Sequence, residues 1–259
     1  MPVITLTSDW IKDDYYLGAV KGRILNQCPE ARIIDMSHKI PSFNVRQAAF
    51  ILKNSYQHFP GGTVHIIGIN STSGPEMRIL GIQVENQYFL TYDNGIYGLI
   101  FRDEPAEAVE IKISKETHLF PELTILADAA CHLAVGKELK DLGKTVKNFA
   151  KTIPLRATMD DSGISGSIIY IDSYQNAISN ITRELFERVR QNRNFEILVQ
   201  SNKYRINRIN NNYGETTTGE ILAVFNSVDL LEIAINRGNA AGLLGLDINS
   251  SVRVNFLRP

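Results

Sequence analysis

Three polar segments of this chain contain residues whose types and spacing could do chemistry. The first is SDWIKDD, at residues 8–14, which directly follows the β-branched run VITLT. A carboxylate at the carboxyl end of such a strand can accept two hydrogen bonds from a sugar diol, and Asp9 is the candidate. An aspartate in this place can instead cap the following helix; this alternative stays open for Asp9 and is favoured for Asp13.

The second segment is NSTSGPEM, at residues 70–77, and it follows the apolar run TVHIIGI. Small polar residues at the same edge of a sheet can hold a ligand through backbone N–H groups. The segment matches neither GxGxxG nor GxxxxGK[ST], so nucleotide phosphate binding is not indicated.

The third segment is IDSYQNAISNI, at residues 171–181. It places Asp172 at a strand end, with Tyr174 and Asn176 just beyond. These side chains suit an amino group, a flat ring and the edge of an adenine. Turns rich in aspartate and asparagine also join strands in many proteins, and this alternative stays open.

The histidines form no HxH or HExxH pattern and there is no GxSxG, so no zinc protease or serine hydrolase motif is present. We interpret His58, His65 and His132 as structural, because they lie within patterned elements. His38 and His118 lie in expected loops, and their roles stay open.

Strands and helices alternate in the first half of the chain, which positions the first two segments at one sheet edge. Extended runs are expected at 3–7, 31–36, 63–69, 79–85 and 87–92, and helices at 15–25, 45–59 and 123–136. Such alternation implies a parallel sheet covered by helices.

The residue composition changes at IPLRATMDDSGISG, a stretch rich in glycine, serine and aspartate. After it, short strands are expected at close intervals. We therefore predict an α/β domain with a central, mostly parallel sheet over residues 1–155. A linker at 156–165 and a smaller all-β barrel or sandwich over 166–259 follow.

The composition excludes several classes of protein. With 259 residues, 44% hydrophobic residues and a formal net charge of −1, the chain has no bulk attraction to nucleic acid or anionic membranes. Cys28 and Cys131 have no metal-ligand spacing, which fits a reducing compartment. The N-terminus has no signal-peptide pattern and no run is long enough for a membrane helix, so a cytoplasmic location is expected.

Read in order, several segments resemble the S-adenosylmethionine hydroxide adenosyltransferase family, to which fluorinating and chlorinating enzymes are related. The segments span Thr5 to Leu246 and are TLTSDWIKDDYYLGAVKGRIL, IIDMSHKIPSFNVRQAAFIL, FPGGTVHIIGI, DNGIYGLI, ADAACHLAVGKEL, IDSYQNAISNIT and FNSVDLLEIAINRGNAAGLLGL. The resemblance implies a homotrimer that holds S-adenosylmethionine between the N-terminal domain of one subunit and the C-terminal barrel of the next. It implies no further cofactor and no metal.

The resemblance also implies roles for individual residues. Asp9 would hold the ribose hydroxyls and Phe43 would lie near the ribose and the sulfonium. Tyr174 and Tyr213 would enclose the adenine, whose edge Asn176 and the backbone of Ala240 would contact. Asp172 and Ser227 would bind the amino-acid end, and Ser73 and Phe120 complete the substrate-binding set.

The reaction implied is a direct substitution at ribose C5′, because the sulfonium is already a good leaving group. The protein has to align the nucleophile, remove its bulk water and hold the cation. Water as the nucleophile gives adenosine and methionine, and halide gives a 5′-halo-deoxyadenosine.

The chain departs from the family at the residues that polarise the water. Hydrolytic members resemble one another in an Asp, Arg and His set, where this chain has Asn70, Met77 and Pro121. Arg78 is one residue late, and a one-residue slip in an extended segment turns a side chain to the other face, so it is a poor substitute. His118, three residues early, would need a rearranged loop.

Glu122 stands where the halide-using relatives have a hydroxyl donor, and a carboxylate there would repel a halide by about a few kcal/mol. We predict Glu122 as a replacement general base, with Asn70 and His118 as the other candidate catalytic residues. The alternative for Glu122 is a loop residue that faces solvent. The competing function is a protein that binds S-adenosylmethionine or adenosine without turning it over.

Overall fold

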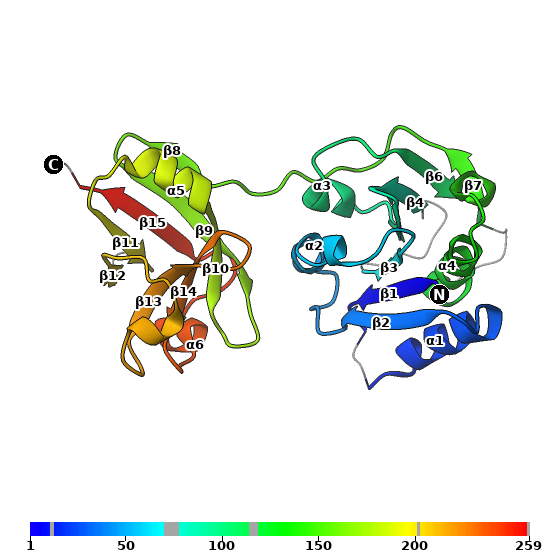
Figure 1. Ribbon diagram of the computed structural model, residues 1–259, viewed down its shortest axis with the longest axis horizontal. Coiled ribbons are helices and arrows are strands. Elements are labelled where there is room, and N and C mark those ends of the chain that lie inside the picture. The colour runs from blue at the N-terminus through cyan, green and yellow to red at the C-terminus, as the bar shows by residue number, and fades with distance from the viewer. Residues whose placement is uncertain (11–12, 70–77, 114–118, 201–202, 258–259) are drawn as a thin grey trace. The chain divides into compact units, whose positions relative to one another are not determined.

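The computed structural model describes residues 1–10, 13–69, 78–113, 119–200 and 203–257. The chain forms two compact units, Met1–Pro154 and Leu155–Pro259, and each unit has its own sheet (Figure 1). The broad expectation of a helix-covered sheet followed by an antiparallel one is confirmed.

The sheet of the first unit is mixed. Its strands lie in the order β2-β1-β3-β5-β4-β6-β7. They are β1 (Val3–Ser8), β2 (Arg32–Ser37), β3 (Val64–Gly68), β4 (Ile79–Val84), β5 (Gln87–Tyr92), β6 (Glu107–Ile111) and β7 (Gly143–Thr145). The pairs β2–β1, β1–β3 and β3–β5 are parallel, whereas β5–β4, β4–β6 and β6–β7 are antiparallel.

The prediction of a mostly parallel sheet is therefore wrong for half of the pairings. For the β4–β5 pair, the reason lies in the turn between the two strands. Glu85 and Asn86 both have left-handed backbones, with φ of 49° and 62°. Two such residues form the tight turn of a hairpin, which requires antiparallel strands.

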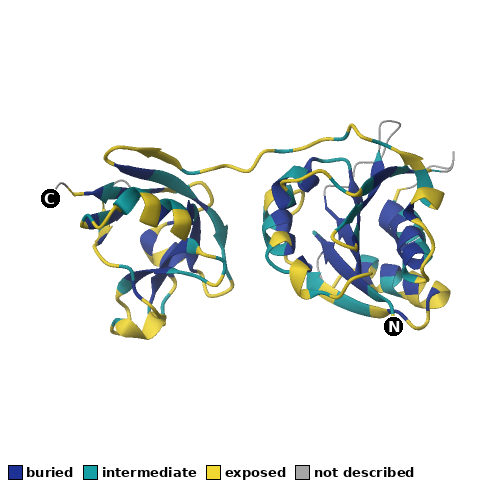
Figure 2. Cartoon of the chain, turned by 45° about the horizontal axis from the view of Figure 1, so that its top comes forward, coloured by how far each residue is buried: buried dark blue, intermediate teal, exposed yellow. Residues whose placement is uncertain are grey.

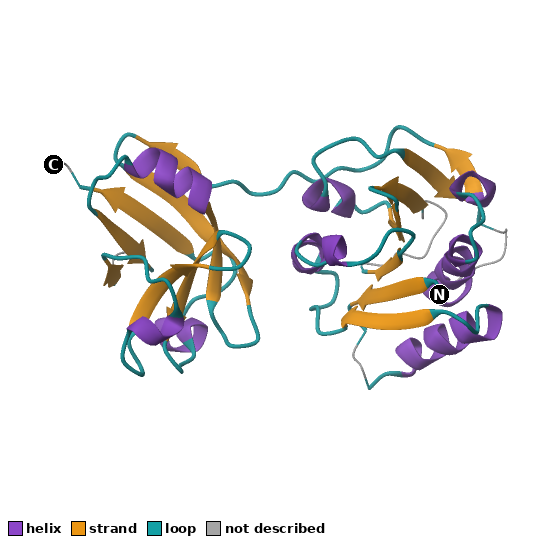
Figure 3. Cartoon of the chain, in the orientation of Figure 1, coloured by secondary structure: helices purple, strands orange, loops and turns teal. Residues whose placement is uncertain are grey.

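Helices cover both faces of this sheet (Figure 3). They are α1 (Tyr15–Gln27), α2 (Val45–Lys53), α3 (Ile96–Ile100) and α4 (Ala127–Ala134), with the short helical turns η1 (Tyr56–His58), η2 (Glu122–Leu126) and η3 (Leu139–Leu142). Alternation along β3 separates two cores: Ile66 packs in the cluster that includes α1 and α4, and Ile67 in the cluster that includes α2 and α3.

The second unit is an antiparallel sheet that packs around one large core, with a small second cluster of Leu222, Val224 and Ala234. Its strands are β8 (Thr158–Asp160), β9 (Gly163–Ile171), β10 (Ala177–Thr182), β11 (Phe195–Val199), β12 (Tyr204–Ile206), β13 (Ile221–Phe225), β14 (Leu230–Ile235) and β15 (Ser251–Phe256). The helical segments are α5 (Arg183–Arg190), η4 (Tyr213–Glu215) and α6 (Ala240–Leu244). Phe186 of α5 is fully buried in this core and makes edge contacts with Phe195 and Phe225.

The chain between β7 and β8 is largely exposed (Figure 2). The segment 156–165, for which the sequence predicts a linker, contains all of β8 and the first residues of β9. Residues 158–160 pair with β9, so this part of the segment belongs to the second sheet.

Candidate functional site

Asp9 lies directly after β1, at the carboxyl end of the parallel strands. Its Oδ2 accepts the backbone N–H of Phe43 at 2.8 Å, and its own N–H donates to the carbonyl of Gly68. Asp9 thus joins the ends of β1 and β3 to the loop after β2. The N-cap of α1 is Asp14, without a side-chain capping bond, so the prediction that Asp13 caps this helix is wrong.

Phe43 is held in a left-handed backbone conformation, with φ of 67°. Next along the chain, Asn44 caps α2 by accepting the N–H of Gln47. The Phe43 side chain is 67% exposed. A bulky residue in this conformation stores strain of about 1–2 kcal/mol. The Asp9 carboxylate is one of the groups that hold it there.

Glu122 begins η2 and is fully buried, so the alternative that it faces solvent is wrong. It packs beside the last residue of β3: a Cβ added at Gly68 would lie 3.1 Å from Glu122 Cγ and 2.6 Å from Trp10 Cζ2. The Phe120 ring makes edge contacts with Trp10 at 5.3 Å and with Tyr16 at 4.9 Å. Glu122, Trp10 and Phe120 therefore gather where β3 ends.

Asn70, Ser73 and His118 lie outside the described residues. Arg78 is described, and its guanidinium is bound to Asp93 Oδ2 at 2.7 Å and to Glu110 Oε2 at 3.0 Å. These contacts hold Arg78 over the antiparallel half of the sheet. They agree with the expectation that it is a poor substitute for a water-polarising arginine.

A Ser–His–Asp series next to Asp9, in which Ser8 and His38 are buried and Asp35 is exposed, was not anticipated from the sequence. Ser8 Oγ lies 2.5 Å from His38 Nδ1, and His38 Nε2 lies 3.3 Å from Asp35 Oδ1. Partial burial acts to raise the pKa of Asp35, but hydrogen bonds from Lys21 and His38 outweigh it and the pKa is lowered. The signal available was the spacing of Asp35 and His38 at the end of an expected strand. Ser8 is fully buried, which suits a fixed support for Asp9 rather than a nucleophile.

In the second unit, Asp172 closes the turn between β9 and β10. Its Oδ1 accepts the N–H groups of Tyr174 and Asn176 at 2.9 and 2.8 Å, and its Oδ2 accepts Asn176 Nδ2 at 3.3 Å. These bonds are those of the turn that the sequence left as an alternative. The turn leaves the Tyr174 ring 78% exposed and buries Asn176.

The start of α6 lies beside this turn. The backbone N–H of Ala241 donates to the carbonyl of Gln175 at 2.9 Å. Asn239 caps the helix, and Ala240, its first residue, is fully buried. The structure thus brings Asp172, Tyr174, Asn176 and Ala240 close together.

Glu232, which was not predicted from the sequence, binds both Tyr213 and Asn226, the residue before Ser227. Tyr213 is part of η4, and its hydroxyl donates to Glu232 Oε1 at 2.7 Å. Asn226, the neighbour of Ser227, donates from Nδ2 to Glu232 Oε2 at 3.1 Å. The signal was a single glutamate within the apolar strand LLEIAI.

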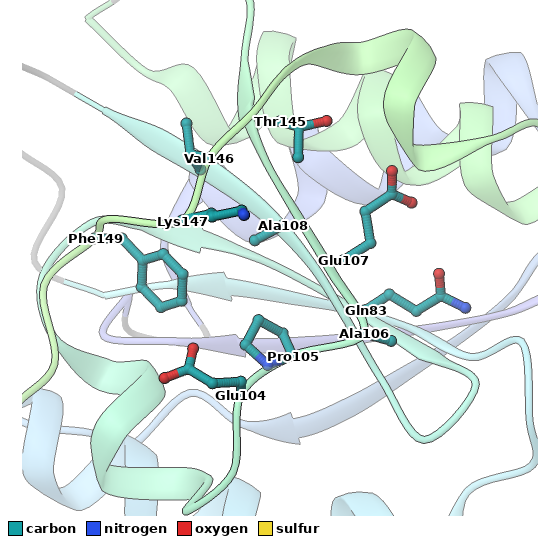
Figure 4. Close-up of a pocket in the computed structure, with 10 residues that line it drawn as sticks. All are labelled: Gln83, Glu104, Pro105, Ala106, Glu107, Ala108, Thr145, Val146, Lys147 and Phe149. Carbon is teal, nitrogen blue, oxygen red and sulfur yellow. The ribbon is translucent and has the colours of Figure 1, made fainter.

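A hollow of about 820 Å³ lies elsewhere on the first unit (Figure 4). None of the predicted site residues lines it. Gln83 and Glu107, which pair in register on β4 and β6, form one wall, and the segment after β7 forms the other. This hollow is therefore distinct from the candidate site.

No helix among the described residues is long and apolar enough to cross a membrane. No group of three or more His, Cys, Asp or Glu side chains in the described ranges could hold a metal ion.

Family models match both units of the chain. The model of the SAM hydroxide adenosyltransferase N-terminal domain matches residues 4–143, and that of the C-terminal domain matches residues 166–253. The chain belongs to the SAM hydroxide adenosyltransferase family. The SAM in this name is S-adenosylmethionine.

An S-adenosylmethionine hydrolase and a fluorinase are both similar to the chain. The (R)-S-adenosyl-L-methionine hydrolase of Methanocaldococcus jannaschii is 26% identical, over 99% of this chain and 97% of the relative. A fluorinase of Actinoplanes sp. is 25% identical over 72% of this chain and 74% of its own length. The crystal structure of an uncharacterized conserved protein from Thermotoga maritima superposes with a TM-score of 0.88 at 25% identity, covering 98% of this chain and 100% of that one.

Proposed function

We propose that this protein hydrolyses S-adenosylmethionine to adenosine and L-methionine, by attack of water on ribose C5′. The observation that carries the proposal is the buried carboxylate of Glu122 where β3 ends, at the same sheet edge as Asp9 and Phe43. Family membership and the hydrolase relatives that match nearly the whole chain support it.

In the first unit, Asp9 is proposed to hold the ribose hydroxyls while it keeps Phe43 in place. A ribose diol offers two donors to a carboxylate. The exposed Phe43 ring is proposed to lie against the ribose and the sulfonium, since an aromatic face attracts a cation.

Glu122 is proposed to act as the general base. The water oxygen forms a bond to C5′, the C5′–S bond breaks, and its electron pair goes to the methionine sulfur. The proton of the water passes to the Glu122 carboxylate. Its negative charge also favours the sulfonium and disfavours a bound halide, because charges interact strongly in a poorly solvated site. The reaction needs no further cofactor, because the substrate carries its own leaving group.

In the second unit, Tyr174 and Tyr213 are proposed to enclose the adenine, with Asn176 and the backbone of Ala240 at its edge. The exposure of both rings, 78% and 44%, leaves faces available for stacking. Asp172 and Ser227 are proposed to bind the amino-acid end. These roles and the site residues of the first unit fit a homotrimer, in which each site combines two subunits.

We also propose that the protein acts in the cytoplasm. Cys28 and Cys131 are both buried free thiols in the structure, which fits a reducing compartment.

The second candidate function is binding of S-adenosylmethionine without turnover. One observation favours it: Asn70, Met77 and Pro121 stand where a water-activating Asp, Arg and His set is expected. Both candidates require binding, and only the first releases adenosine.

The experiment is to incubate the purified protein with S-adenosylmethionine and to separate the products by chromatography. Adenosine and methionine in equal amounts support hydrolysis. Glu122→Gln should lower kcat by about 100-fold, the scale of a lost general base, while KM changes little. Glu187→Gln on α5 is the matched control. Tight binding by calorimetry with no adenosine release overturns the hydrolase proposal in favour of the second candidate.

A further inference from the structure

Glu232 occupies an unusual place for a carboxylate. On β14, Leu231 and Ile233 point into the core of the second unit, and Glu232 therefore points to the other face of the sheet. In register with it across the neighbouring strands are Ile178 on β10 and Val224 on β13. Glu232 is 2% exposed. The residue is thus a buried acid between apolar neighbours.

Each carboxylate oxygen of Glu232 has a defined partner. Oε1 accepts the hydroxyl of Tyr213 at 2.7 Å, and Oε2 accepts Nδ2 of Asn226 at 3.1 Å. Asn176 lies two residues before Ile178, close enough to Glu232 for its side chain to act to lower the pKa of that carboxyl. The Asn176 amide bonds to Asp172 at 3.3 Å. One side chain therefore connects three segments that are distant in the sequence.

Burial of a carboxylate is costly unless hydrogen bonds compensate for lost water. Burial raises the pKa of Glu232, the bonds from Tyr213 and Asn226 act to lower it, and the charge of Asp172 acts to raise it again. Burial raises the pKa of the Tyr213 hydroxyl, and the hydrogen bond to Glu232 and the charge of that carboxylate raise it further. An apolar residue would fill this place without that cost, so the acid is expected to serve a task beyond packing.

We propose that Glu232 is a positioning residue that fixes the Tyr213 ring and the Asn176 amide for adenine. The inference rests on the proposed function, because it assigns the adenine to these two side chains. Glu232 need not touch the ligand. Its carboxylate fixes the tilt of the Tyr213 ring through the phenol oxygen and leaves the ring face available. Through Asn226 it also holds the turn that carries Ser227.

The test compares Glu232→Ala, Glu232→Gln and Tyr213→Phe with the wild-type protein. Adenosine release gives kcat and KM, and calorimetry gives Kd for S-adenosylmethionine and for adenosine. We expect Glu232→Ala to raise KM and both Kd values by about tenfold, as loss of hydrogen bonds to a charged group does, with kcat nearly unchanged. Tyr213→Phe keeps the ring and loses the bond to Glu232, so it should change the same constants in the same direction.

The double variant Glu232→Ala with Tyr213→Phe should bind no more weakly than the weaker single variant, because both single variants remove the same Tyr213–Glu232 hydrogen bond. Glu196→Gln is the matched control. Its carboxylate accepts bonds from Arg205 and Asn255 on other strands, and KM should not change. If Glu232→Ala does not fold, Glu232→Gln keeps the shape and one acceptor oxygen, and circular dichroism identifies the folded variants.

Unchanged Kd values for adenosine in both Glu232 variants would overturn the inference. A wild-type protein that binds adenosine but releases none from S-adenosylmethionine would overturn the hydrolase proposal, and the Kd comparison would still decide the role of Glu232. A wild-type protein that binds neither compound would overturn both.

Discussion

The backbone N–H of Phe43 lies 2.8 Å from Oδ2 of Asp9, and Phe43 has a φ of 67°. The proposed ribose-binding carboxylate therefore also holds a strained backbone, and that backbone carries the aromatic ring proposed to face the sulfonium. The two functions of the loop after β2 are linked through one side chain.

Phe43→Gly should stabilise the fold while it weakens ligand binding. Glycine adopts a left-handed backbone without strain, so the free energy of unfolding should rise by about 1 kcal/mol. KM for S-adenosylmethionine should rise because the ring is lost. Denaturant unfolding and adenosine release measure the two effects. Gln191→Gly, at the left-handed C-cap of α5, should stabilise similarly and leave KM unchanged. A destabilised Phe43→Gly variant would contradict the strain at this position.

Gly68→Ala should destabilise the protein by about 1–3 kcal/mol, as overpacking of a core does. The added Cβ would meet Trp10 at 2.6 Å and Glu122 at 3.1 Å, so both side chains must shift. We expect kcat to fall as well, since Glu122 moves. Gly22→Ala, in the middle of α1 with nothing within 4 Å, is the control and should stabilise by about 0.5–1 kcal/mol. Equal thermal stability of Gly68→Ala and the wild type would show that this contact is not tight.

Folding stability should fall as the pH drops from about 6.5 to about 4, because of His65. Burial lowers the pKa of His65 from 6.5 to about 4, although the hydrogen bond to Gln87 acts to raise it. Between these values the unfolded chain binds a proton that the folded chain does not, so acid favours unfolding. The contribution is present above pH 6.5 and reaches a loss of about 3 kcal/mol near pH 4.

His65→Gln should lack this part of the pH dependence, because glutamine does not titrate. The measurement is the free energy of unfolding in urea across the same pH range. His58→Gln, at an exposed histidine, should follow the wild-type curve. Identical slopes for His65→Gln and the wild type would rule out this role of His65.

The wild-type protein should form no 5′-halo-deoxyadenosine at high chloride concentration, because the buried Glu122 carboxylate repels a halide. Glu122→Ser replaces that charge by a hydroxyl donor and should admit chloride, with a 5′-chloro product detected by mass spectrometry. Chlorinated product from the wild-type protein would contradict the assigned effect of Glu122.

Local patterns in the sequence predicted the elements well. The β-branched run at 3–7 is β1, and the apolar spacing after Asp14 is α1. The hairpin of β4 and β5 was not recognised, because ENQ does not match the usual glycine-containing turn, and the sheet was predicted as mostly parallel. The left-handed backbone angles of Glu85 and Asn86 make β4 and β5 antiparallel, and the residue types alone do not predict these angles.

The site features that could not be predicted from the sequence depend on contacts between segments that are far apart in the chain. Glu122 lies next to Gly68 and Trp10 only after folding, so its burial is not visible in the local pattern. Glu232 on β14 and Tyr213 in η4 are 19 positions apart, and their hydrogen bond forms only in the folded chain. The turn at Asp172 was foreseen as an alternative because its bonds are local.

The division of the first sheet into a parallel and an antiparallel half has a consequence for how this fold can evolve. Asp9, Phe43 and Gly68 all follow or end strands of the parallel half, β1, β2 and β3. Arg78 forms ion pairs with Asp93 and Glu110 in the antiparallel half. Changes on the antiparallel half that spare the β6–β7 connection, which carries Glu122 and Phe120, should therefore affect the proposed chemistry less than changes in the three loops that follow β1, β2 and β3.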